Sequence, residues 1–512
     1  MSKKLFKSTS LVSSMTMISR VLGFVRDMVA AQIFGATAAV DAFYIAFKIP
    51  NFMRALFAEG SFSQAFVPVL SEYREHESIS DTKRFISYIG GNLGSVLLII
   101  TLLGLFIAPL LIMISAPGLE QFRFDLATHM LRITFPYLIL ISLTAFVGAT
   151  LNSFGRFGVP AFTPALLNIV LIATALFLSP YLNISVYSQA WGVLIAGFVQ
   201  LAFQLIALWR RDLLVAPRIN WRDPGVRKVL LLMLPALFGA SIGQLSLLLN
   251  TIFASFLPPG SVTWLYYSDR LAYFPLGVFG VALATVVLPH LSRQYAKKSQ
   301  KQYVAALDWA IRINLLIGIP AALILWVLAG PIITTLFNYG IFNQFDVLMT
   351  RQSVIAYSIG LTAFMLVKVL VTGFFARQNV KTPVRIGVVV IIANVCFNAL
   401  LIVPLRHAGL ALATSLSAWL NVLLLLVTLI RKQIFHFVSG WPVFLSRLIA
   451  ANFIMVLVIY LLRSPLAVWF NRSWEMRFTH LFLLLFIGII TYFAVLFISG
   501  IRFKHLLVHE TI

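Results

Sequence analysis

The sequence predicts an all-α polytopic membrane protein of about fourteen transmembrane helices, arranged as two six-helix lobes in a parallel repeat plus two C-terminal helices. Composition is the first observation behind this fold class, because 60% of the 512 residues are hydrophobic and only 11% are charged. Soluble globular proteins carry about 25% charged residues, so a water-soluble enzyme of this size is excluded. A β-barrel is excluded as well, because barrel strands alternate apolar and polar residues over about ten positions.

Long apolar runs are the second observation. A helix that crosses a bilayer needs about 20 apolar residues, and fourteen stretches of the chain meet that length. They lie near residues 11–34, 41–70, 86–115, 126–152, 160–183, 186–209, 229–256, 263–291, 304–329, 350–376, 386–404, 407–430, 443–463 and 478–500.

The distribution of Lys and Arg predicts the topology. If the N-terminus lies inside, the loops and tails on that side hold 24 Lys and Arg residues. The opposite side holds six, at Arg123, Arg351, Arg406, Arg463, Arg472 and Arg477. Cytoplasmic loops of membrane proteins collect these cations, so both termini are expected in the cytoplasm. The net charge of +23 is then a mark of topology and not of nucleic-acid binding.

An internal repeat is the third observation. Lys48, Phe57 and residues 68–71 recur as Arg270, Phe279 and residues 289–292, at an offset of 221–222. Residues 143–146 and 163–164 recur at 361–364 and 382–383, at an offset of 218–219. The offsets predict lobes at 1–215 and 216–435 in the same orientation, with two further helices and a short tail at 436–512. Transporters are commonly built from such repeats, with the substrate site between them.

Charged residues stand where lipid-facing residues would be apolar. On the first predicted helix, Arg20, Gly23, Arg26 and Asp27 occupy one arc of about 120°. An Arg at the centre of a membrane helix costs roughly 2.5–3.5 kcal/mol, and each Leu or Ile returns only about 0.3–0.6 kcal/mol. This helix must therefore face protein or water.

The second and eighth predicted helices add further charged and polar residues, at Asp41, Lys48, Asn51, Arg54, Glu59, Asp269 and Arg270. We interpret the set as a hydrated central cavity whose arginines bind an anion, since the guanidinium fork binds phosphate oxygens bidentately. Gly23 and Pro50 would let the first two helices bend, as gating segments do. The alternative is that these cations lie near helix ends or pair with Asp27, Asp41 and Asp269.

Enzyme signatures are absent from the sequence. It has no Gly-x4-Gly-Lys-[Ser/Thr] phosphate loop and no His, Asp or Glu cluster with metal-ligand spacing. The single cysteine, Cys396, excludes an intrachain disulfide. We therefore expect neither catalysis nor a cofactor nor a metal site.

Several blocks resemble the bacterial MurJ (MviN) lipid II flippases of the multidrug/oligosaccharidyl-lipid/polysaccharide exporter superfamily, and the resemblance covers essentially the whole chain. The blocks are Ser19 to Asp27, Asp41 to Phe43, Lys48 to Arg54, Phe57 to Gly60, Tyr267 to Leu271 and Lys381 to Val384. The resemblance implies that Arg20, Arg26, Arg54, Arg270 and Asp41 line the substrate cavity. Ser19, Asp27, Lys48, Asn51, Glu59 and Asp269 would then support it.

The function implied by the resemblance is transport of lipid II, the polyprenyl-pyrophosphate-linked disaccharide-peptide precursor of peptidoglycan. The expected route is from the inner to the outer leaflet of the bacterial cytoplasmic (inner) membrane, by alternating access, for cell wall biosynthesis. A monomer surrounded by membrane lipid is expected, with room for association with cell-wall synthesis proteins. Two rivals stay open: an exporter of another polyprenyl-linked glycan or of a drug, and a non-transporting scaffold for cell-wall enzymes.

The resemblance also raises the questions of the lipid tail and of energy coupling. The last two helices would line a groove for the tail, or else they only thicken the bundle. Some relatives bind sodium through carboxylate and amide oxygens of helices 7, 11 and 12, but residues 224–268 and 382–431 contain no Asp or Glu here. A carboxylate-based sodium site is therefore not expected, and the membrane potential is the predicted energy source.

Overall fold

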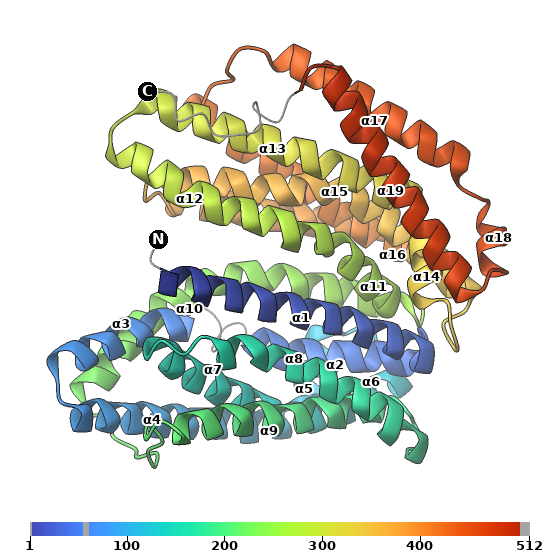
Figure 1. The fold of residues 1–512 in the computed structure, drawn as a ribbon. Coiled ribbons are helices and arrows are strands. Elements are labelled where there is room, and N and C mark those ends of the chain that lie inside the picture. The colour runs from blue at the N-terminus through green and yellow to red at the C-terminus, as the bar shows by residue number, and fades with distance from the viewer. Residues whose placement is uncertain (1–2, 55–60, 502–512) are drawn as a thin grey trace. The chain divides into compact units, whose positions relative to one another are not determined.

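A computed structural model describes residues 3–54 and 61–501 of the chain (Figure 1). The described residues form helices and connecting loops without a strand, which confirms the predicted all-α class. By its internal contacts the chain divides into two compact units, Met1–Thr263 and Trp264–Ile512.

The first unit is built from helices that pack in pairs, α1 on α8, α2 on α6, α3 on α10 and α7 on α9. Its elements are α1 (Lys3–Phe34), α2 (Ala38–Arg54), α3 (Ser61–His76), α4 (Ile79–Phe106), α5 (Ala108–Ser115), α6 (Gln121–Thr134), α7 (Tyr137–Ser153), α8 (Gly158–Ala173), the π-helix η2 (Thr174–Leu178), the 3-10 turn η3 (Ser179–Tyr181), α9 (Tyr187–Trp209) and α10 (Pro224–Ser255).

The second unit centres on α15, which packs against α12, α13 and α16. Its elements are α11 (Ser261–Pro275), whose first three residues still belong to the first unit, the π-helix η4 (Leu276–Gly280), α12 (Val281–Ala296), α13 (Gln300–Val327), α14 (Ala329–Phe337), α15 (Gln344–Phe375), α16 (Lys381–Arg431), α17 (Trp441–Leu462), α18 (Leu466–Phe470) and α19 (Trp474–Ile498).

The helix α16 is two membrane spans joined by a tight turn. A straight helix of its 51 residues would be roughly 77 Å long, far more than the roughly 30 Å hydrocarbon core of a bilayer. Its backbone leaves the helical region at Arg406 (φ 49°, ψ −129°), and Asn394 Nδ2 donates to Ser417 Oγ at 3.1 Å although the residues are 23 apart. The two arms therefore run side by side, as the separate predicted spans 386–404 and 407–430 require.

The remaining predicted spans agree with the helices. Among the described residues, ten helical segments are long and apolar enough to cross a membrane, with α16 counted once. The predicted spans 11–34 and 229–256 correspond to α1 and α10. The predicted span 41–70 takes in most of α2 and the first part of α3, and its residues 55–60 lie outside the described residues. The fold is thus consistent with fourteen spans.

The boundary between the units differs from the predicted lobe boundary at 215/216. Contacts place α10 with the first unit because it packs on α3, and the segment before α10 hydrogen-bonds to α4 through Ser87 and Asn92. The predicted boundary follows the sequence offset and not the contacts, so the six-plus-six-plus-two division stays a prediction.

The last two long helices form an antiparallel pair, α17 beside α19 (Figure 1). A Cβ at Gly488 would come within 2.6 Å of Ile459 Cδ1, so α19 approaches α17 closely at this glycine. An apolar core that includes Met455, Leu484 and Leu316 joins the pair to α13. At the α18 end, Arg477 donates to the carbonyls of Thr334, Asn338, Trp469 and Phe470.

Candidate functional site

The cationic segment of α1 packs against α8. Arg26 and Asp27 are both buried, and Asp27 Oδ1 accepts from Arg26 Nε at 3.0 Å and from Nη2 at 2.6 Å. The third nitrogen, Nη1, donates to Oδ1 of Asn168 on α8 at 3.0 Å. A buried charge is tolerated when it is paired and hydrogen-bonded. Arg26 is therefore held as a compensated pair whose guanidinium is oriented through all three nitrogens.

Asn168 is a site residue that the sequence reasoning missed. Its Nδ2 donates to the carbonyl oxygen of Ser19 at 3.0 Å, so one amide binds α1 at two places about two turns apart. Gly23 lies between them, and a Cβ there would be 3.6 Å from Asn168 Nδ2. A Cβ there would be in ordinary van der Waals contact with the amide, so α1 and α8 lie close together at this glycine. An isolated Asn within the apolar stretch 160–183 is the signal that could have identified it.

Two other predicted residues have different surroundings. Arg20 is exposed, and across residues 3–54 and 61–501 its guanidinium has no hydrogen-bond or ion-pair partner. Glu59 lies outside the described residues. Of the two arginines of α1, Arg20 is therefore exposed and Arg26 is enclosed.

Asp41, at the N-terminal end of α2, is fully buried. Its Oδ2 accepts from the Gly260 amide at 2.7 Å, and its Oδ1 accepts from the amide and the hydroxyl of Thr263 at 2.8 and 2.6 Å. Arg123 Nη1 lies 4.0 Å from the carboxylate and donates to the Leu257 carbonyl at 3.3 Å. The carboxylate of Asp41 therefore caps the first turn of α11 in this structure.

The other predicted residues of α2 lie toward its C-terminal end. Lys48 Nζ donates to Thr251 Oγ1 on α10 at 3.0 Å, and Arg54 Nε donates to Asn51 Oδ1 at 2.9 Å. Pro50 is buried inside the helix. Thirteen residues of helix separate Asp41 from Arg54, which is roughly 20 Å. The charges of α2 are thus spread along the helix and do not form one cluster.

In the second unit, α11 carries Asp269 and Arg270. Asp269 is half-buried and Arg270 is exposed. Arg270 donates to Tyr266 Oη from Nε at 3.2 Å and from Nη2 at 3.1 Å. Its Cζ lies 5.3 Å from the centre of the Tyr266 ring. The tyrosine thus helps to orient the Arg270 guanidinium.

This chemistry suits anion binding and not metal binding. Arg20 and Arg270 are exposed, and Lys48 and Arg54 are half-buried, so each can offer donors to phosphate oxygens. No group of three or more His, Cys, Asp or Glu side chains within the described ranges could hold a metal ion.

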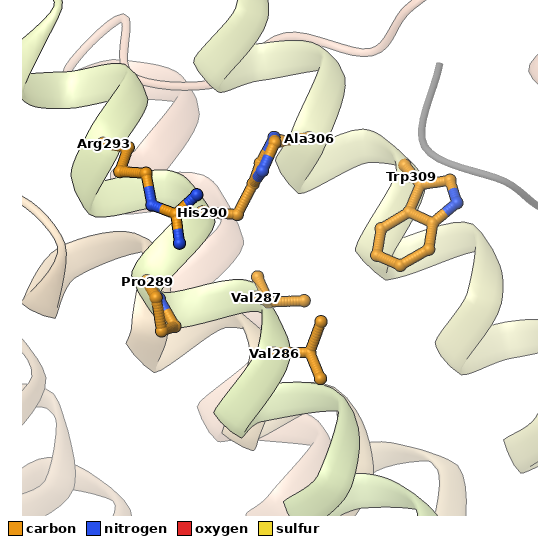
Figure 2. Close-up of a pocket in the computed structure, with 7 residues that line it drawn as sticks. All are labelled: Val286, Val287, Pro289, His290, Arg293, Ala306 and Trp309. Carbon is orange, nitrogen blue, oxygen red and sulfur yellow. The ribbon is translucent and has the colours of Figure 1, made fainter. Parts of the chain in front are cut away.

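A cavity between α12 and α13 is separate from these residues (Figure 2). It has a volume of about 210 Å³ and is lined by Val286, Val287, Pro289, His290, Arg293, Ala306 and Trp309. None of the predicted site residues lines it. Sites for drug-sized ligands usually have about 300–1,000 Å³, so this cavity is too small for a lipid-linked disaccharide-peptide.

Comparison with known proteins identifies the family. The family model described as "Lipid II flippase MurJ" matches residues 30–484. The chain belongs to the MurJ lipid II flippase family. A relative from Vibrio cholerae, described as "Probable lipid II flippase MurJ", is 44% identical over 99% of this chain and 98% of its own length.

Solved structures agree with this family. The structure titled "Lipid II flippase MurJ, inward closed conformation" is similar to this chain with a TM-score of 0.80 and 27% identity, over 95% of this chain and 97% of the other. An inward-facing multidrug resistance MATE transporter of the MOP superfamily has a TM-score of 0.68 at 15% identity, over 83% of this chain and 97% of its own. The second likeness shows a shared fold alone.

Proposed function

We propose that this chain moves lipid II from the inner to the outer leaflet of the cytoplasmic membrane by alternating access, for peptidoglycan and cell wall synthesis. Membership of the MurJ family over residues 30–484, with full-length relatives described as lipid II flippases, carries the proposal. A multi-pass helical fold with cationic side chains on α1, α2 and α11 supports it. Transport, and not catalysis, is the proposed activity.

The proposed substrate contact is a pyrophosphate clamp. Arg20 and Arg26 of the first unit and Arg270 of the second bind the pyrophosphate, and Arg54 supports them. The planar guanidinium fork matches phosphate oxygens, so the side chains supply geometry as well as charge. Asp27 is the counterion of Arg26 when no substrate is bound, and the pyrophosphate competes with it for the same N–H groups.

Supporting roles are proposed for the neighbouring residues. Ser19, Asp27, Lys48, Asn51, Glu59 and Asp269 surround the headgroup cavity or hold its cations in place. Gly23 and Pro50 let α1 and α2 bend during the cycle, because glycine adds backbone freedom and proline removes a helix hydrogen bond. Asp41 contributes through the helix that it caps.

We further infer the orientation and the coupling. Both termini lie in the cytoplasm, because 24 Lys and Arg residues fall on that side and six on the other. The protein works as a monomer. An anionic headgroup that leaves a negative interior gains about 2.3 kcal/mol per charge per 100 mV, so the membrane potential drives transport.

The test is depletion of the protein in a growing bacterium, followed by leaflet-specific quantification of lipid-linked precursors. Lipid II is expected to accumulate in the inner leaflet while its synthesis continues. Accumulation of another polyprenyl-linked glycan would favour a different exporter. Normal leaflet distribution of all these precursors would contradict a flippase and favour a scaffold.

A further inference from the structure

We propose that two buried glutamines of α9 are positioning residues for the Arg26 guanidinium, which they reach through the neighbouring helix α8. The glutamines are Gln200 and Gln204, which contact α8 at Thr163, and Asn168 of α8 passes their effect on to Arg26. The importance of this geometry for transport rests on the proposed function. The contacts themselves lie entirely within the first unit.

Both glutamines bind α8 at the same residue. Gln200 Nε2 donates to the carbonyl oxygen of Thr163 at 3.0 Å, and Gln204 Nε2 donates to Thr163 Oγ1 at 2.7 Å. Tyr137 Oη of α7 donates to Gln200 Oε1 at 3.3 Å, which orients that amide. All four side chains are buried. Thr163 is thus held from α9 through both its backbone and its side chain.

This contact lies where α8 lacks one of its own hydrogen bonds. Pro164 follows Thr163 inside the helix, and a proline nitrogen has no hydrogen to donate to the carbonyl four residues earlier. Membrane helices bend at such prolines, and groups of neighbouring helices compensate for the missing bond. The bonds from α9 at Thr163 therefore fix the direction in which α8 continues beyond Pro164.

The segment beyond Pro164 carries Asn168 on the face toward α1. Thr163 and Asn168 are five residues apart, which is about 7.5 Å along a helix and about 140° around it, and α8 packs on both α9 and α1. Asn168 Oδ1 accepts from Arg26 Nη1, and its Nδ2 donates to the Ser19 carbonyl, each at 3.0 Å. A shift of about 0.5 Å breaks such a bond. A change of bend at Pro164 would therefore separate Asn168 from Arg26.

The test measures lipid II flipping in proteoliposomes by the variants Gln200→Leu and Gln204→Leu. Leucine is of similar size and removes the amide donor, so Thr163 loses one bond to α9 in each variant. Because Arg26 is then less well placed for the pyrophosphate, the lipid II concentration at half-maximal rate should rise about three- to tenfold. The maximal rate should change less than about twofold, since the arginine itself remains.

Gln189 is the matched control, because it is a third buried glutamine of α9 that donates to α8, from Nε2 to the Leu171 carbonyl at 3.2 Å. That carbonyl also accepts from Thr174 Oγ1 at 3.2 Å, and it lies seven residues beyond Pro164. Gln189→Leu should lower the thermal stability as the other two variants do and leave the half-maximal concentration unchanged. An equal rise in all three variants would reflect a general loosening of α8 and would overturn the positioning role.

A double-mutant cycle tests whether the glutamines act through Asn168. Asn168→Ala alone should raise the half-maximal concentration, and adding Gln200→Leu should raise it little further, because residues in one hydrogen-bonded chain are not additive. Effects that multiply in the double variant would show that Gln200 acts independently of Asn168, and would contradict the proposal.

Hydrogen–deuterium exchange in the absence of lipid II gives a structural readout. Peptides that cover residues 160–170 should exchange faster in both leucine variants than in wild type. Unchanged exchange together with unchanged flipping would overturn the proposal. If the leucine variants do not fold, Thr163→Val removes only the hydroxyl that accepts from Gln204 and should give a smaller change in the same direction. If the wild-type protein did not move lipid II, the proposed function would fail, while the exchange would still test the contact between α9 and α8.

Discussion

The segment that leads into α10 lies directly on α4, and one glycine makes this contact possible. A Cβ at Gly91 would come within 2.3 Å of the carbonyl oxygen of Arg218 and within 2.7 Å of its amide nitrogen. Backbone cannot move aside as a side chain can, so Gly91→Ala has to lift residues 216–220 from α4. Four hydrogen bonds join that segment to Ser87 and Asn92.

Each of these bonds contributes about 0.5–1.5 kcal/mol, and replacing a helical glycine by alanine returns about 0.5–1 kcal/mol. We therefore expect Gly91→Ala to destabilise the protein by about 3 kcal/mol. Gly94 is the control, because it lies three residues further along α4 and a Cβ there would meet nothing within 4 Å. Gly94→Ala should stabilise α4 by about 0.5–1 kcal/mol.

The assay is thermal unfolding of the purified protein in detergent, followed by size-exclusion chromatography of the heated samples. Gly91→Ala should lose its monodisperse peak at a clearly lower temperature than wild type, and Gly94→Ala at the same or a higher one. Equal stability of the two alanine variants would refute the close contact between α4 and residues 216–220.

Three further predictions concern the transport cycle. Asp27→Asn removes the counterion of Arg26, so lipid II should bind more tightly while the flipping rate falls; weaker binding in a titration would contradict the proposed exchange. Phe453→Gln on α17 and Phe482→Gln on α19 change exposed apolar residues, so both variants should fold normally. If these helices hold the lipid tail, the variants should translocate lipid II slowly. Normal transport would favour the alternative, in which the two helices only thicken the bundle. In proteoliposomes, an imposed membrane potential should drive transport without a sodium gradient; a strict sodium requirement with no response to potential would contradict the coupling.

The helical fold could be predicted because a bilayer leaves a chain few options. Backbone groups in lipid must be satisfied within a helix or a closed barrel, so hydropathy and length were enough to locate the spans. The turn of α16 is an example, since Pro404 and Arg406 interrupt an otherwise apolar run and the structure bends there.

The partners of the charged residues could not be predicted in the same way. Asp41 binds donors more than 200 residues away in the sequence, and nothing in a local pattern indicates which helix N-terminus a carboxylate will cap. Asn168 is similar, because its role depends on how closely α8 approaches Gly23.

The contact partners of the arginines that the sequence places on the outer side could not be predicted from the sequence either. Arg123, Arg463 and Arg477 each donate to backbone carbonyls, and Arg472 donates to Ser464 Oγ. The first three of these arginines thus bind carbonyl groups at or near helix ends. In the positive-inside rule, arginines on the outer side are exceptions. Here the tertiary contacts of their side chains explain their presence.

Lipid II flipping by the purified protein in proteoliposomes, compared with the variant Arg20→Ala, Arg26→Ala, Arg270→Ala, tests the central claim most directly. Wild type should transfer lipid II to the opposite leaflet when a membrane potential is imposed, and the triple variant should fold but lose transfer. The matching Lys substitutions should also impair it, because lysine keeps the charge and loses the bidentate fork. Transfer by the triple alanine variant at the wild-type rate would contradict the clamp, and no transfer by the wild-type protein would contradict the proposed function.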